Sequence, residues 1–235
     1  MALPPGTTEE AFLREVDEEM RRDLAMGIWQ RWGKWILGAV VVALLAFAGY
    51  LYFQNRGERV AGKQGEQLDA AMTALAENQA AKAEPELAKL AASDQPGYKA
   101  LAGFAQAQAL VAKNDLKGAA SRFGAIAGDT TLPKPFRDEA LIRQTLIEFD
   151  QIKPEVVIGR LQGLAVPDSE WFGTAGEMVA AAYLKQGKRD QAGKLFGQIA
   201  QSRSAVPDSI RQRAVQMAGV LGVDAIDQTQ EKKTQ

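Results

Sequence analysis

The sequence contains no cysteine and no histidine. Without cysteine, the chain cannot form a disulfide framework, a thiolate nucleophile or a soft-metal site. Without histidine, it lacks the commonest general base near neutral pH and the commonest metal ligand. Any catalysis would have to use carboxylates, lysine, serine or tyrosine alone. We therefore expect no metal and no cofactor.

A basic excess is also missing, because 28 lysine and arginine residues are balanced by 29 acidic residues, which leaves a net charge of −1. A chain with this balance has no surplus of cations to bind nucleic acid by releasing counterions. Glycine-rich phosphate loops, GxSxG and HExxH are absent as well. Carboxylates cluster at Glu9-Glu10, at residues 17–19 and at Asp138-Glu139, which is typical of solvated helix positions. We predict a non-enzymatic protein with no catalytic residues and no small-molecule substrate.

One run of residues, from Trp35 to Phe53, contains 19 positions without a charge. A helix of this length extends about 28 Å at ~1.5 Å per residue, close to the ~30 Å hydrocarbon core of a bilayer. The run therefore predicts a transmembrane helix at 35–53 in preference to an apolar core helix. Ala39 and Ala43 would let another membrane helix dock closely, although ordinary anchor composition explains them equally well. Aromatic residues expected at the two membrane interfaces are Trp29, Trp32, Trp35, Tyr50, Tyr52 and Phe53.

A cleaved secretion signal is the alternative, because Ala46-Phe47-Ala48 resembles a small-residue cleavage site. However, the 34 residues before the run contain seven acidic residues, and the apolar run continues to Phe53. Both features favour an uncleaved anchor. Within about 15 residues of the run, four positive charges before it and three after it give little bias in orientation. Because a single early span normally exports the long remainder, we expect a single-pass protein of the bacterial inner membrane with a cytoplasmic N-terminus and a periplasmic C-terminal domain.

Residues 1–34 form the predicted cytoplasmic tail, in which residues 7–32 have a helical pattern. Thr7 or Thr8 would cap this helix, and apolar residues recur every four positions at 12, 16, 20 and 24. The opposite face mixes acidic and basic residues. The helix either docks on a cytoplasmic partner or on the membrane surface, or it is a solvated connection to the span.

From residue 54 onward, alanine-rich helical segments alternate with short breaks. Prolines at 96, 133, 167 and 207 mark breaks spaced by 37, 34 and 40 residues, a period typical of helix-pair repeats. Two segments that begin YKALAGFAQAQALVAKNDLKGAA at Tyr98 and WFGTAGEMVAAAYLKQGKRDQAG at Trp171 align without a gap at an offset of 73 residues. Degenerate units fit before and between them, around 58–93 and from Phe136.

The matched positions predict packing. Small residues on both helices let an antiparallel pair approach closely, and an aromatic residue late in the second helix fills the space between pairs. Asn114-Asp115 and Gly187-Lys188 fall in the tight turn inside each pair, where residues that tolerate the left-handed conformation belong. This pattern resembles the tetratricopeptide repeat. The predicted packing residues are Tyr98, Ala107, Leu110, Ala119, Phe123, Leu161, Trp171, Ala180, Tyr183, Ala192 and Phe196.

The pentapeptide AVPDS occurs twice, at 165–169 and 205–209. It predicts a turn and a helix start, with aspartate and serine as caps. An amphipathic helix from Pro207 would cap the array. The sequence thus predicts an all-α chain with four parts: a cytoplasmic tail at 1–34, a transmembrane helix at 35–53, an α-solenoid of tetratricopeptide-like helix pairs at 54–226 and a disordered tail at 227–235.

The layout of a short charged tail, an early span and a small helical array resembles the YfgM family. The closest local likeness is the segment from Tyr98 to Ala120, together with the position of the span. The resemblance implies an ancillary subunit of the Sec translocon that works with a membrane-anchored periplasmic chaperone of the parvulin-like class. It thus implies protein partners beside the membrane. A scaffold for another envelope complex, such as cell division or respiratory assembly, is the alternative.

Overall fold

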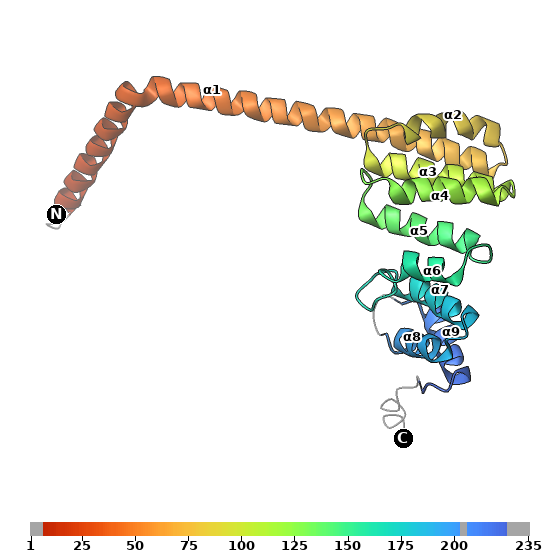
Figure 1. Cartoon of the computed structure of the whole chain (residues 1–235). Coiled ribbons are helices and arrows are strands. Elements are labelled where there is room, and N and C mark those ends of the chain that lie inside the picture. The colour runs from red at the N-terminus through yellow and green to blue at the C-terminus, as the bar shows by residue number, and fades with distance from the viewer. Residues whose placement is uncertain (1–6, 203–205, 225–235) are drawn as a thin grey trace. The chain divides into compact units, whose positions relative to one another are not determined.

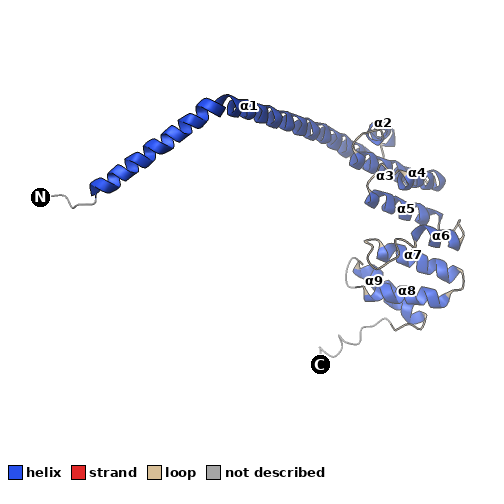
Figure 2. Ribbon diagram, turned by 60° about the vertical axis from the view of Figure 1, so that its left-hand side comes forward, coloured by secondary structure: helices blue, strands red, loops and turns tan. Residues whose placement is uncertain are grey.

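The computed structural model describes residues 7–202 and 206–224, with side chains from Arg31 onward except Trp32, Ile36 and Glu58. These residues form nine α-helices and no strand, so the predicted all-helical fold class is confirmed for this part of the chain (Figures 1 and 2). The helices are α1 (Thr7–Ala76), α2 (Ala80–Ala91), α3 (Pro96–Ala112), α4 (Leu116–Gly128), α5 (Lys134–Glu148), α6 (Pro154–Leu161), α7 (Phe172–Lys185), α8 (Arg189–Gln201) and α9 (Asp208–Val220).

The first helix, α1, runs without interruption through both predicted boundaries, at 34/35 and at 53/54. None of its 70 residues is proline, so no backbone hydrogen bond is removed within it. Contacts along the chain divide it into two compact units, Met1–Gly62 and Lys63–Gln235. The last turns of α1 therefore belong to the second unit. The side chains of the tail helix, those of the predicted caps Thr7 and Thr8 included, and the predicted disordered tail lie outside the described residues.

Among the described residues, one stretch of helix, Gly33–Ala76, is long and apolar enough to cross a membrane. Its most apolar 18-residue window has a mean hydropathy of 2.3, and no residue of that window is buried. The large side chains of the run are exposed, for example Leu37 at 59% and Phe53 at 72%. An exposed apolar surface of this size, which no described residue covers, is typical of a segment that contacts a membrane or another protein.

The second unit is a series of helix pairs (Figure 1). Residues 63–76 of α1 pair with α2, and the pairs α3 with α4, α5 with α6 and α7 with α8 follow. Three of the turns inside pairs contain a residue in the left-handed conformation: Asn78 with φ 60°, Asn114 with φ 59° and Gly187 with φ 75°. Asp115 then caps α4, because its carboxylate accepts the Gly118 N–H at 2.9 Å. The sequence pattern places the turns of the second and fourth pairs correctly.

Each pair stacks on the next through its second helix, so that α2 packs on α3, α4 on α5, α6 on α7 and α8 on α9. Three hydrophobic clusters follow one another along this stack. The first joins residues 63–76 of α1 to α2 and α3, the second joins α3, α4 and α5, and the largest extends from α5 to α9. The outer side of α9 exposes mainly polar residues, as a terminal cap requires.

The third pair is the irregular one. Its second helix, α6, has 8 residues, and residues 162–171 continue as turns and bends up to α7. Leu161 nevertheless stands in the core, with 0% of its surface exposed. The loose sequence match of this unit therefore corresponds to a shortened helix.

The capping role predicted for AVPDS is wrong at both sites. At 165–169 no helix begins, and the Ser169 hydroxyl accepts the N–H of Trp171 at 3.1 Å within a turn. At the second copy Pro207 occupies the N-cap position of α9, and the helix has no side-chain cap. Proline offers no side-chain oxygen there, and Asp208, one position too late, bonds to Arg211 instead. Ala205 lies outside the described residues.

Candidate functional site

The structure places the small predicted packing residues in the interior. Ala107, Ala119, Ala180 and Ala192 are all 0% exposed. An alanine at such a position leaves room for the neighbouring helix, which a larger side chain would displace. The burial of all four residues matches this expectation, and their role in the contact between the helices of a pair stays a prediction.

The large predicted packing residues divide into two groups. Phe123 and Phe196 are 1% and 3% exposed, and each lies in a hydrophobic cluster between its own pair and the next. The four half-buried residues are Tyr98, Leu110, Trp171 and Tyr183. Tyr98 lies at the edge of the first cluster, and Trp171 and Tyr183 lie at the edge of the largest. Leu110 lines a hollow of about 340 Å³ between the last turns of α1 and the helices α2, α3 and α4.

Phe172 is a core residue that the sequence pattern does not reveal. It is 1% exposed and begins α7, directly after the half-buried Trp171. At the offset of 73 residues its counterpart is Lys99, so the repeat pattern indicates a surface position. The pattern predicts instead that the neighbouring Trp171 is the packing residue, because Trp171 aligns with Tyr98.

A groove on the first helices of the first three pairs is the candidate functional site. It has a volume of about 490 Å³ and is lined by residues of α1, α3 and α5. Met72 and Leu101 are 49% and 42% exposed there, so the groove presents large apolar side chains to solvent. The full lining is Leu68, Met72, Leu101, Phe104, Ala105, Gln108, Phe136, Glu139 and Arg143.

Phe104 forms the centre of the groove wall. Its ring lies 5.7 Å from the ring of buried Phe123 and 6.4 Å from that of Phe136, measured between centroids. The guanidinium of Arg143 lies 5.5 Å from the Phe104 centroid and forms an ion pair of 2.7 Å with Glu139. The two charges of the lining are therefore paired with each other, and the groove as a whole is neutral.

The equivalent face of α7 lacks the two large apolar side chains that α3 contributes to the groove. At the offset of 73 residues, Leu101 becomes Thr174 and Phe104 becomes Glu177. Arg213 of α9 bonds both carboxylate oxygens of Glu177, at 2.7 and 2.8 Å, and these bonds raise the pKa of the Arg213 guanidinium. The apolar groove is thus confined to α1, α3 and α5, and an ion pair occupies the corresponding place farther along the array.

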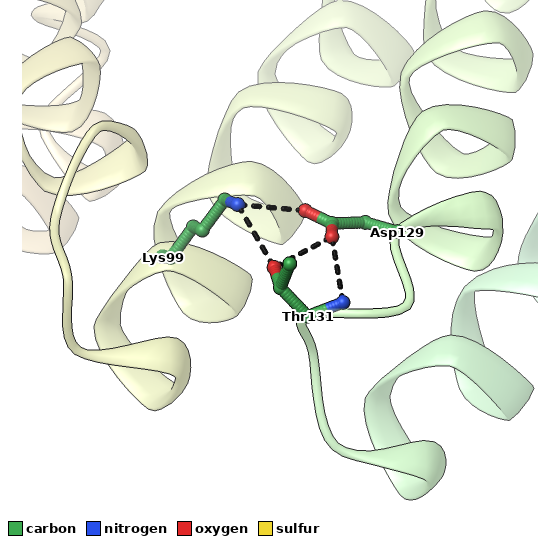
Figure 3. A network of polar contacts seen from close by, with 3 residues as sticks. All are labelled: Lys99, Asp129 and Thr131. Carbon is green, nitrogen blue, oxygen red and sulfur yellow. Dashed lines mark hydrogen bonds and ion pairs between the residues drawn. The ribbon is translucent and has the colours of Figure 1, made fainter.

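A second polar contact ties α3 to the loop between α4 and α5 (Figure 3). Lys99 Nζ lies 2.7 Å from Asp129 Oδ2 and donates to the Thr131 hydroxyl at 3.2 Å. The Thr131 hydroxyl and N–H both donate to Asp129 Oδ1, at 2.6 and 2.9 Å. The hydrogen bonds from Lys99 and Thr131 lower the pKa of Asp129 from 3.8 to about 2. This contact holds the loop that leads from the second pair to the third against α3, and it lies outside the groove lining.

Within the described part of the chain, no three acidic side chains gather where they could hold a metal ion. Among the described residues, the two groups with shifted pKa values, Asp129 and Arg213, both take part in ion pairs between helices or loops. A shift of this origin reflects structural pairing rather than a catalytic cleft.

The predicted membrane-interface residues that can be placed are exposed on α1. Trp35, Tyr50, Tyr52 and Phe53 have between 64% and 76% of their surface accessible. The pair proposed as a docking face, Ala39 and Ala43, is also exposed there. The side chains of Trp29 and Trp32 lie outside the described residues.

In a comparison with protein families, a model described as a tetratricopeptide repeat-like domain matches residues 27–218. The match takes in all the helix pairs and most of α9. No curated protein and no solved structure matches the chain.

Proposed function

The chain belongs to the family of tetratricopeptide repeat-like domains, and from this premise we propose that it is a membrane-anchored, non-enzymatic scaffold that binds other proteins. Domains of this family are typically protein-interaction modules, with their helices stacked so that one continuous surface is presented. The observation that carries the proposal is the open apolar groove on α1, α3 and α5. A neutral groove with exposed Met72 and Leu101 is suited to a protein partner.

The proposed membrane anchor is residues 35–53. Its length, its hydropathy and the exposure of its large side chains support this role, although a signal sequence near the N-terminus would share the first two properties. The acidic tail and the apolar residues that continue to Phe53 favour an anchor that is retained. With the N-terminus in the cytoplasm, residues 54–226 would lie in the periplasm of a bacterial cell.

Anchoring would keep the groove close to the membrane. Leu68 follows Phe53 by 15 residues, so the connecting chain spans at most about 54 Å in any conformation. A tether of this length raises the effective concentration of the groove for partners in the same membrane. Weak contacts would then suffice for binding.

The proposed partners are Sec translocon subunits and a membrane-anchored periplasmic chaperone. The likeness of the segment from Tyr98 to Ala120 and of the early span to the YfgM family supports this choice. In this role the scaffold would assist proteins as they leave the channel.

Affinity purification of the full chain from membranes in mild detergent tests the proposal. We expect translocon subunits and the chaperone to co-purify with the wild type, and we expect Leu101→Gln to reduce their recovery. Thr174→Gln, the same change at the equivalent place on α7, is the matched control and should leave recovery unchanged. Recovery of division or respiratory proteins instead would favour the alternative envelope scaffold, and equal recovery with both variants would reject the groove.

A further inference from the structure

The proposed function leaves open what kind of protein segment enters the groove on α1, α3 and α5. We propose that its occupant is an amphipathic helix of a partner protein, which presents an uncharged apolar face to the groove. This inference rests on the proposed function and deepens it. Three features of the lining support it: its charge, its backbone and its extent.

The charge of the lining selects against a charged segment. Glu139 and Arg143 are its two ionisable residues, and they bond to each other at 2.7 Å. Arg143 also lies over the ring of Phe104. A carboxylate of a partner would have to compete with Glu139, and an ammonium group would have to displace Arg143. Either would lose its hydration on entering an apolar groove without gaining an unpaired counter-charge.

The backbone of the lining selects against an extended segment. Every lining residue lies within α1, α3 or α5, where N–H and C=O groups are engaged in helical bonds. Even Phe136, in the first turn of α5, donates its N–H to Pro133 O at 3.1 Å. The side-chain amide of Gln108 is the one polar group of the lining without a partner among the described residues.

An extended peptide would therefore bury N–H and C=O groups that the groove cannot satisfy. A helix satisfies these groups internally and offers apolar side chains at i, i+3 or i+4 and i+7. A helical partner thus fits the chemistry of this surface, in which packing supplies nearly all of the contact.

The extent of the groove sets the length of the recognised face. Its volume of about 490 Å³ is within the range of pockets that hold a few side chains, roughly 300–1,000 Å³. On the α7 side, the ion pair between Glu177 and Arg213 replaces the apolar surface. The groove can thus hold the anchors of about two helical turns.

Three fluorescein-labelled peptides of 18 residues (a chosen probe length of about five turns) test the inference. The first carries leucine at i, i+3, i+4 and i+7 among alanine, glutamine and serine. The second has the same composition in scrambled order, and the third has two central residues of the first replaced by proline. Binding to the full chain in nanodiscs of phosphatidylcholine and phosphatidylglycerol is measured by fluorescence anisotropy, with empty nanodiscs subtracted.

We expect the amphipathic peptide to bind at least about tenfold more tightly than the scrambled and proline peptides, and to gain helicity when bound. Leu101→Gln should weaken its binding about tenfold or more, whereas Thr174→Gln on the equivalent face of α7 should not. Both positions are exposed, so thermal unfolding of the two variants should match that of the wild type.

Several results would overturn the inference. If the proline peptide binds as tightly as the helical one and Leu101→Gln abolishes both, the groove accepts extended segments; the helix inference then fails while the proposed function stands. If Leu101→Gln does not change the binding of the amphipathic peptide, the peptide binds outside the groove. If empty nanodiscs bind the peptide equally well, its binding site is the lipid. If none of the peptides binds, the helix inference is rejected, and co-purification decides the proposed function independently.

Discussion

Replacing Phe123 by alanine should loosen one part of the array and leave the rest almost unchanged. Phe123 is 1% exposed and fills the cluster shared by α3, α4 and α5. Truncation of a buried phenylalanine to alanine costs about 3–5 kcal/mol, because transfer energy is lost and a cavity remains. The stability of a repeat array is nearly a sum of nearest-neighbour terms, so the loss of stability should be confined to α3, α4 and α5.

Native-state hydrogen exchange of the full chain measures this loss helix by helix. A cost of 3–5 kcal/mol should speed the exchange of the slowest amides in α3 to α5 by roughly 200- to 5,000-fold. The exchange rate of an unprotected chain is the upper limit of this acceleration. Amides of α7 to α9 should change by less than about tenfold. Phe196→Ala, in the cluster from α5 to α9, should reverse the pattern. Ser121→Ala, on the exposed side of α4, should alter neither.

Uniform acceleration of all helices by Phe123→Ala would show that the array unfolds as one unit. Acceleration below tenfold in α3 to α5 would show that Phe123 does not fill the space between the pairs. Either result would refute the role assigned to this position.

Three further predictions concern other features of the chain. Gly187→Ala should destabilise the second unit by about 1–2 kcal/mol in thermal unfolding, because alanine is strained at a φ of +75°. No neighbouring atom crowds the added Cβ, so this backbone strain is the whole expected cost. Asn114→Gly, at a left-handed position that glycine adopts freely, should change the stability by less than about 0.5 kcal/mol. Because the pKa of Asp129 is lowered in the folded protein, its carboxylate stabilises the fold above about pH 4, and this contribution should be lost as the pH falls toward about 2. The melting temperature of Asp129→Asn should therefore fall less steeply than that of the wild type between about pH 4 and about pH 2. An equally steep fall in both proteins would contradict the contact. Leu44→Arg, at the centre of the apolar run, should reduce membrane insertion by about 2.5–3.5 kcal/mol, seen as release during carbonate extraction, while Leu44→Ala should remain in the pellet.

Much of the array could be predicted from the sequence because its packing repeats. Alanines and aromatic residues recur at one offset, and the positions of Phe123 and Phe196 are buried as that pattern indicates. Turns that require a left-handed residue are also visible, since Asn114 and Gly187 tolerate that conformation at low cost. These features depend on local chemistry and are therefore readable without the fold.

Other features depend on what surrounds a segment. The two AVPDS copies have the same residues and different structures, because the first is followed by further turns and the second by a helix that starts one residue after its proline. The groove escaped prediction because Leu101 and Phe104 have the spacing of core residues on α3. Their replacement by Thr174 and Glu177 in the matched unit was the available clue, since equivalent core positions would both be apolar.

Site-specific photocrosslinking in native membranes is the most direct test of a membrane-tethered scaffold with a groove on α1, α3 and α5. The chain has no cysteine, so Met72→Cys carries a single photoactivatable label in the groove, and Val220→Cys carries the same label at the exposed end of α9. We predict that the Met72 label gives discrete adducts with translocon or chaperone subunits, that Leu101→Gln in the same chain removes them, and that the Val220 label gives none. Equal adducts from both labels, or adducts that persist with Leu101→Gln, would contradict the assignment of this groove as the partner-binding surface.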